Sequence, residues 1–265
     1  MRINNVDLHI VDSGDGSEAI VFAHGMLFSG VMFDPQVAAL NRQYRCVVYD
    51  HRGHGRSAVP KSGYDMDTLA KDGMDLIETL GIGPCHFVGV SLGAAVGLRL
   101  ALWRPDLLRS LVIINGDADP EPRKSRAKYR GLNLLARIFG LKLAVNQVMP
   151  IVFGQTFMND PDRAMERNFW RRQIAAGDRW GITRTVASII DRPGLYAELG
   201  SIKTPTLVLS GDEDVAVPPQ GPERMHKAIP GSKFLRIPKA GHSMTLEQPE
   251  AVNIAIKEFL ATIDS

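Results

Sequence analysis

The sequence predicts an α/β fold with a mostly parallel sheet, and three observations lead to this prediction. Short apolar runs alternate with helical stripes over residues 1–117 and again over 199–265. Within residues 86–104, HFVGVSLGAAVGLRLALWR, a strand pattern leads directly into a helix pattern. Between 118 and 198 the alternation stops and glycine or proline interrupts the helical patterns. We therefore expect one α/β core domain, residues 1–117 and 199–265, with an inserted helical cap, or lid, domain at 118–198.

Composition and charge exclude several classes of protein. The 31 basic and 29 acidic residues leave a formal net charge of +2. This near balance does not predict a basic surface that binds nucleic acid. With no apolar run of 18 residues and a strand-like start, the sequence predicts a cytoplasmic protein without stable membrane insertion. Cys46 and Cys85 lie in or beside apolar strand-like runs, which favours small buried side chains over a disulfide or a metal site.

The elements before the cap follow from apolar runs and their boundaries. The expected strands are 6–12, 18–23, 45–50, 86–90 and 107–114. Residues 20–23 are apolar on both faces, as a central parallel strand should be. A short helix over 34–41 begins at Asp-Pro, and a longer one over 66–80 has an apolar stripe and ends at Gly81.

Alternation resumes after the cap with strands at 206–210 and 233–237 and a closing helix at 249–263. In sheets of this kind, ligands bind beyond the carboxyl ends of the strands. The loops that follow each expected strand are therefore the places to look for chemistry.

The cap begins with a strongly basic stretch, EPRKSRAKYR. Its basic residues are Arg123, Lys124, Arg126, Lys128 and Arg130. A solvated helix face is the simpler interpretation of such a run. The alternative is an entrance that attracts anionic substrates or a membrane surface.

Ser91 is the single residue between the strand and the helix of the 86–104 stretch. Gly89 and Gly93 flank it in the pattern G-x-S-x-G, and such a crowded turn leaves no room for side chains two positions away. The turn holds the serine hydroxyl at the carboxyl edge of the sheet, beside the positive end of a helix. This is the position of a nucleophile.

A serine nucleophile needs a base and a buried anion that orients the base. His242 follows the last expected strand, and Asp214 follows the strand before it. The chain order is then Ser, Asp, His, with all three at carboxyl ends of strands. Asp212 in the same loop and Asp117 after the strand at 107–114 are alternative acids.

Five segments together resemble the α/β-hydrolase superfamily over the whole chain. They are His24-Gly25, the loop from Asp50 to Ser57, Gly89-Val90-Ser91-Leu92-Gly93, Gly211-Asp212-Glu213-Asp214 with Pro218, and Gly241-His242. The resemblance implies an α/β-hydrolase fold with an eight-stranded, mostly parallel sheet. It also implies Ser91 as nucleophile, His242 as general base and Asp214 as the acid.

The remaining site predictions concern the oxyanion hole and the substrate pocket. The turn supplies the backbone N–H of Leu92, and the resemblance implies Met26 as the second donor. Candidate pocket residues are the apolar side chains Leu27, Phe28, Met149, Phe153 and Trp170. No metal spacing or cofactor motif occurs, so the expected partner is a small-molecule ester or lactone.

The expected activity is serine-dependent hydrolysis of carboxylic esters or lactones through an acyl-enzyme, with similarity to enol-lactonases, acyl-homoserine lactonases and small carboxylesterases. Three alternatives remain open: a carbon–carbon bond hydrolase, a cofactor-free haloperoxidase or perhydrolase, and a hydrolase-like ligand receptor. The sequence leaves the natural substrate and the oligomeric state undetermined.

Overall fold

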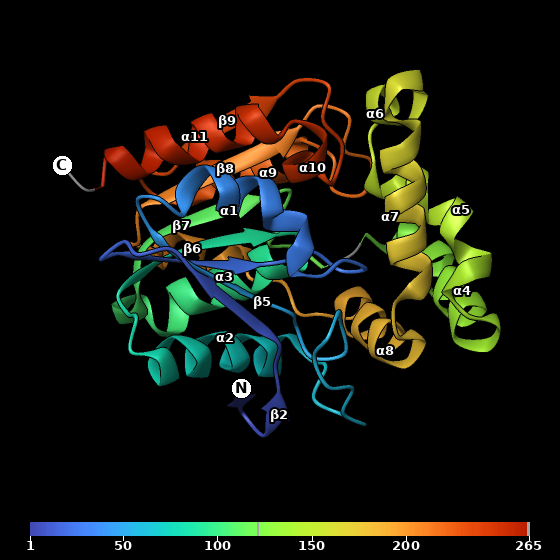
Figure 1. Ribbon diagram of the computed structural model, residues 1–265, viewed down its shortest axis with the longest axis horizontal. Helices are drawn as coiled ribbons and strands as arrows, with labels where there is room; N and C mark the ends of the chain where they lie inside the picture. Colours follow the sequence, from blue (N-terminus) through green and yellow to red (C-terminus); the bar gives the residue numbers. More distant parts are fainter. Residues whose placement is uncertain (121, 264–265) are drawn as a thin grey trace.

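A computed structural model describes residues 1–120 and 122–263 (Figure 1). Its strands are β1 Arg2–Ile3, β2 Val6–Asp7, β3 Ile10–Ser13, β4 Ala19–Ala23, β5 Arg45–Tyr49, β6 Cys85–Val90, β7 Leu108–Ile114, β8 Thr206–Gly211 and β9 Lys233–Ile237. Its α-helices are α1 Asp34–Leu40, α2 Met66–Leu80, α3 Leu92–Trp103, α4 Arg123–Phe139, α5 Leu141–Val152, α6 Gln155–Asn159, α7 Ala164–Ala176, α8 Arg179–Ile190, α9 Gln220–Ala228, α10 Met244–Glu247 and α11 Pro249–Ala261.

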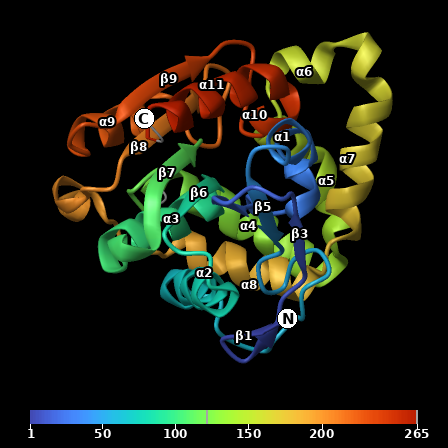
Figure 2. The same cartoon turned by 60° about the vertical axis from the view of Figure 1, so that its left-hand side comes forward.

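The main sheet has seven strands in the order β3-β5-β4-β6-β7-β8-β9. Figure 2 labels β3, β5, β6, β7, β8 and β9 of this sheet. β3 pairs with β5 antiparallel, and each other neighbouring pair is parallel. The mostly parallel sheet is confirmed, but the expected count of eight strands is wrong for the described part of the chain. The strand expected at 6–12 divides into β2, which forms a separate hairpin with β1, and β3, which joins the sheet.

Helices cover both faces of the sheet, with α1 and α11 on one side and α2 and α3 on the other (Figure 1). Alternate residues of the central strand β4 explain why both faces need covering. Ile20 and Phe22 pack with α1 and α11, whereas Val21 and Ala23 pack with α2 and α3. Each of these side chains is fully buried, which is the pattern of a parallel strand with two apolar faces.

Five helices, α4 to α8, lie between β7 and β8 in the sequence and gather beside one edge of the sheet, at the right of Figure 1. No helix in the described ranges is long and apolar enough to cross a membrane. Cys46 and Cys85 are free and buried, as predicted, and burial raises the pKa of each thiol to about 12.

Candidate active site

The backbone at Ser91, between β6 and α3, is strained. Its φ of 50° and ψ of −100° lie outside the regions that residues with a Cβ normally adopt. A Cβ on Gly93 would lie 1.9 Å from the carbonyl oxygen of Ala23, and one on Gly89 would lie 2.3 Å from the carbonyl oxygen of Gly93. Because only glycine fits at both positions, the sequence allows strand and helix to approach closely enough for this turn to form.

His242 and Asp214 meet in the structure although they come from different loops. His242 Nδ1 lies 2.8 Å from Asp214 Oδ2, and both residues are buried. A carboxylate can only accept, so Nδ1 carries the proton and Nε2 of the neutral ring is the basic nitrogen. The other oxygen, Asp214 Oδ1, accepts hydrogen bonds from the backbone N–H groups of Ala216 at 2.8 Å and Val217 at 2.9 Å, which fixes the carboxylate.

The two alternative acids, Asp212 and Asp117, lie in different surroundings from Asp214. Asp212 forms an ion pair with Arg236 at 2.6 Å, at the surface. Asp117 lines the same cavity as Ser91, and burial raises its pKa against the opposing charges of Arg192 and Arg224. The geometry therefore favours Asp214 as the partner of His242.

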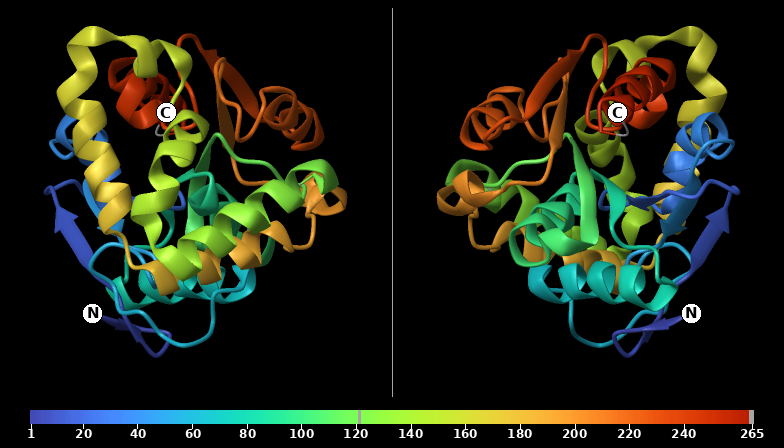
Figure 3. Two further views of the ribbon diagram at one scale, coloured as in Figure 1. Left: turned by 90° about the vertical axis from the view of Figure 1, so that its right-hand side faces the viewer. Right: turned by 90° about the vertical axis from the view of Figure 1, so that its left-hand side faces the viewer.

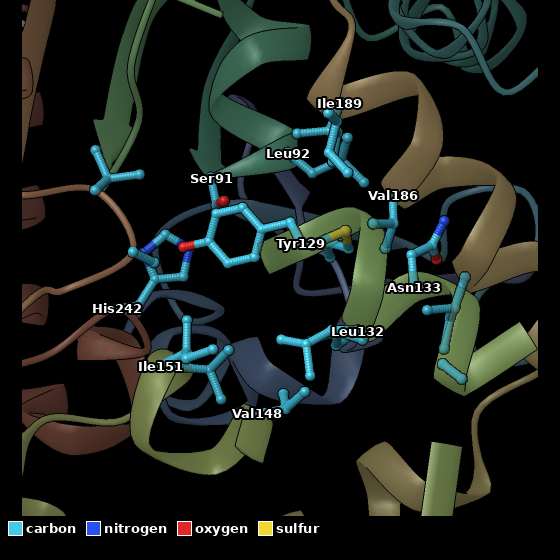
Figure 4. Close-up of a pocket in the computed structure, with 18 of the residues that line it drawn as sticks. Ser91, Leu92, Tyr129, Leu132, Asn133, Val148, Ile151, Val186, Ile189 and His242 are labelled. Carbon is cyan, nitrogen blue, oxygen red and sulfur yellow. The ribbon is translucent and has the colours of Figure 1, made fainter. Parts of the chain in front are cut away.

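Ser91 and His242 both line one cavity between the sheet edge and the helices that follow β7 (Figure 4). Most of its walls are apolar. They include Leu92 and Ala95 of α3, Leu132 and Ala136 of α4, Leu141, Ala144, Val148, Ile151 and Val152 of α5, and Ile182, Val186, Ile189 and Ile190 of α8. Such a cavity fits a ligand with a substantial apolar part.

The predicted pocket residues need correction. Leu27 lines the cavity that contains Ser91, whereas Phe28, Met149, Phe153 and Trp170 do not line it and pack in the apolar core beside it. Phe28 and Trp170 line a second, separate cavity. The rings of Phe28 and Trp170 pack edge to face with centroids 5.7 Å apart, and Phe28 also meets Phe153 at 6.1 Å. These side chains pack on one another and so support the cavity from outside instead of forming its wall.

Met26 and Leu92, the predicted oxyanion donors, both line the cavity. Leu92 is the first residue of α3, where backbone N–H groups have no partner within the helix and the helix dipole is positive. His24 holds the loop before Met26: its Nε2 accepts from the backbone N–H of His51 at 2.9 Å. Nδ1 must then donate, to the carbonyl oxygen of Gly25 at 2.7 Å.

Sequence reasoning missed Asn115, although the residue closes a recognised strand. Its side-chain Nδ2 donates to the carbonyl oxygens of Gly241 at 2.9 Å and His242 at 3.0 Å. Its Oδ1 accepts from the backbone N–H of Gly211 at 2.9 Å. One buried amide thus joins the ends of β7 and β8 to the histidine loop, and only its position after a strand hinted at this role.

Tyr129 was also missed. It lines the cavity, and in Figure 4 its ring extends from α4 toward Ser91 and His242. Its place within a basic, solvent-facing run of sequence gave no signal for such an orientation.

Glu247 of α10 is a buried carboxylate that organises the loop around His242. Its Oε2 accepts from the backbone N–H of Gly241 at 2.9 Å and of Gly154 at 2.8 Å, and its Oε1 accepts from that of Ser243 at 3.0 Å. Burial raises the pKa of Glu247 to about 7, although these three hydrogen bonds oppose the shift. The same carboxylate therefore holds both neighbours of His242 and the start of α6.

Comparison with known proteins identifies the family of this chain. The model of a family described as alpha/beta hydrolase fold matches residues 18–249. A protein of Pseudomonas syringae pv. syringae named putative carbamate hydrolase RutD is 30% identical over 97% of this chain and 98% of its own. The enol-lactonase from Burkholderia xenovorans LB400 superposes with a TM-score of 0.92 at 27% identity, covering 98% of this chain and 99% of its own. A thermophilic esterase from Thermogutta terrifontis gives 0.90 at 29% identity, covering 98% and 95%. The chain belongs to the alpha/beta hydrolase family.

Proposed function

We propose that this protein hydrolyses carboxylic esters or lactones through an acyl-enzyme at Ser91. The observation that carries the proposal is the hydrogen bond from His242 to Asp214 beside a strained serine, with Ser91 and His242 facing one cavity. Relatives named as esterase and enol-lactonase support the same reaction class.

The proposed reaction has two steps. His242 Nε2 takes the proton of Ser91 Oγ as that oxygen attacks the carbonyl carbon, and the backbone N–H groups of Met26 and Leu92 stabilise the oxyanion. The histidine then gives the proton to the departing alkoxide, which in a lactone stays attached to the acyl group. Water, deprotonated by His242, releases the acid and restores the serine.

The cap assignment, residues 118–198, is part of this proposal. Helices α4, α5 and α8 supply most of the apolar wall opposite Ser91. We propose that this segment selects the acyl group, because the core contributes mainly the reacting residues.

A substrate panel tests the proposal. It contains p-nitrophenyl butyrate and octanoate, an aliphatic lactone, an acyl-homoserine lactone and ethyl carbamate, the last because of the relatives named carbamate hydrolase. The apolar walls favour the esters and lactones over the small polar carbamate. Faster turnover of the carbamate than of every ester and lactone would replace this proposal with carbamate hydrolysis, and no turnover of any substrate would reject it.

The acidic limb of the pH profile is expected to have its midpoint above the ordinary pKa of a histidine side chain. Burial lowers the pKa of His242, but the charge of Asp214, their hydrogen bond and the charge of Glu247 outweigh it, so the pKa is raised above 6.5. Only the neutral ring accepts a proton, so kcat/KM should reach half its maximum above pH 6.5. The measurement is kcat/KM from about pH 5 to pH 9. A midpoint below 6.5 would contradict the influence of Asp214.

Replacing Glu247 with glutamine is expected to slow catalysis about tenfold or more, because displacement of a catalytic loop by a fraction of an ångström is costly. The amide cannot accept from Ser243 and from the Gly154 and Gly241 pair at once. Removing the charge of Glu247 also lowers the pKa of His242, so the acidic limb should move to lower pH. A tenfold loss with an unmoved limb would assign Glu247 a structural role only.

Stability gives a second readout for Glu247. Its folded-state pKa of about 7 lies above the ordinary 4.5, so protonation favours the folded state. Its contribution is therefore full below pH 4.5 and is lost as the pH rises toward about 7. Thermal melts of wild type and Glu247→Gln across this range should show the wild type losing stability relative to the variant. A constant difference would contradict the raised pKa.

A further inference from the structure

The segment that contains α4 carries an unbalanced positive charge. From 123 to 142 the sequence has seven basic residues and no acidic one: Arg123, Lys124, Arg126, Lys128, Arg130, Arg137 and Lys142. The other parts of the chain then hold 24 basic and 29 acidic residues, a net charge of −5. Arg130 pairs with Asp191, the residue after α8, at 2.7 Å, which offsets one of the seven charges. The excess of positive charge therefore lies on α4 and the start of α5.

Large apolar side chains are exposed in α4 and at the start of α5. Leu134, Ile138, Phe139 and Leu143, here called the cap patch, are 57%, 55%, 61% and 57% exposed. Leu134 and Ile138 are four residues apart on α4 and so lie on one face of the helix. Figure 3, left, shows α4 crossing the front of this side of the molecule. Apolar and basic residues together make α4 an amphipathic helix with an outward apolar strip.

Trp180, at the start of α8, lies within the same basic surface. The residue is 39% exposed, and the guanidinium groups of Arg179 and Arg137 lie 4.8 Å and 5.8 Å from the centroid of its ring. The contact with Arg137 joins the start of α8 to α4. Tryptophan beside arginine is well suited to a lipid–water interface, because each combines an apolar body with a polar or charged end.

We propose that the cap patch and its surrounding basic residues bind the surface of an anionic lipid bilayer, with α4 lying in the plane of the interface. Apolar side chains enter the boundary between headgroups and acyl chains while lysine and arginine meet the anionic headgroups. A second copy is the other candidate to cover the patch. A two-fold dimer would place the same basic residues face to face, and their repulsion disfavours it.

The inference rests on the outer face of α4 and not on the proposed ester hydrolysis. The opposite face of the same helix, through Leu132 and Ala136, lines the cavity that contains Ser91. The thickness of a helix, about 10 Å, therefore separates the proposed lipid contact from the cavity. Binding to lipid can be measured without any substrate.

Co-sedimentation with vesicles tests the proposal. Wild-type protein is expected to sediment with vesicles of phosphatidylcholine and phosphatidylglycerol, to stay in solution with phosphatidylcholine alone, and to be released by high salt. Ile138→Ser should lower the partition coefficient at least about threefold, since it removes an apolar group from the interface. Ile254→Ser on α11 is the matched control, because Ile254 is 56% exposed against 55% for Ile138.

Charge-reversal variants test the contribution of the basic residues separately from that of the apolar cap patch. Lys124→Glu with Lys128→Glu should reduce binding to anionic vesicles about tenfold or more, whereas Lys203→Glu with Lys257→Glu, also exposed, should leave it within about twofold. Thermal melts confirm that each variant is folded. Equal loss in both pairs, or no sedimentation of wild type with anionic vesicles, would overturn the proposal. A concentration-dependent dimer that Ile138→Ser dissociates, without vesicle binding, would assign the patch to a second copy.

Discussion

Replacing Ser91 with alanine is expected to lower kcat/KM for p-nitrophenyl butyrate by about 10⁵-fold or more, because loss of the nucleophile leaves only binding and oxyanion stabilisation. The variant keeps its Cβ, so the backbone with φ of 50° and the packing of Gly93 on Ala23 are unchanged. Its melting temperature should therefore match that of the wild type. Steady-state kinetics and a thermal melt on the same sample check both expectations.

Ser201→Ala is the control for this substitution. Ser201 is exposed, and its hydroxyl donates to the carbonyl oxygen of Glu198 at 2.7 Å, away from the cavity. It should leave kcat/KM within about twofold, as surface substitutions usually do. Hydrolysis by a folded Ser91→Ala protein at the wild-type rate would reject the acyl-enzyme at Ser91.

The strained turn could be predicted because its causes are local in the sequence. Two glycines at fixed spacing, an apolar strand before them and an apolar helix after them specify how β6 leads into α3. The 1.9 Å approach of a Gly93 Cβ to Ala23 shows why no other residue fits there. The sequence also predicts a mostly parallel sheet, but it gives no strand order, and the strand expected at 6–12 divides into β2 and β3.

The cavity wall could not be predicted in the same way. Periodicity identifies an apolar face but not the element that covers it, so core residues and wall residues have the same pattern. Phe153 and Trp170 face aromatic neighbours, while Val148 and Val186 face the cavity. Asn115 escaped notice because its partners lie far away in the sequence, up to 127 residues for its contact with His242. Glu247 lies within six residues of Gly241 and Ser243, but its contact with Gly154 spans 93 residues, and a carboxylate in a helical pattern gives no sign of burial. Only tertiary structure reveals such contacts.

Replacing Asp214 with asparagine is expected to lower kcat about 10⁴-fold while KM changes little. The carboxylate now accepts the proton of His242 Nδ1 at 2.8 Å, whereas the NH₂ group of an asparagine would donate to that nitrogen. The ring would then carry its proton on Nε2 and could not take one from Ser91. Loss of the charge also removes a cause of the raised pKa of His242, so the acidic limb of the residual activity should move to lower pH.

Asp212→Asn and Asp117→Asn make this prediction specific to one carboxylate. Asp212 lies in the same loop, but its pair with Arg236 is at the surface, where such pairs contribute about 1 kcal/mol or less. Its substitution should leave kcat within about twofold. Asp117 shares the cavity with Ser91, so its substitution should affect KM more than kcat. A 10⁴-fold fall in kcat for Asp117→Asn, with a smaller one for Asp214→Asn, would move the acid to the end of β7. The hydrogen bond between His242 and Asp214 is the reason to expect the opposite order.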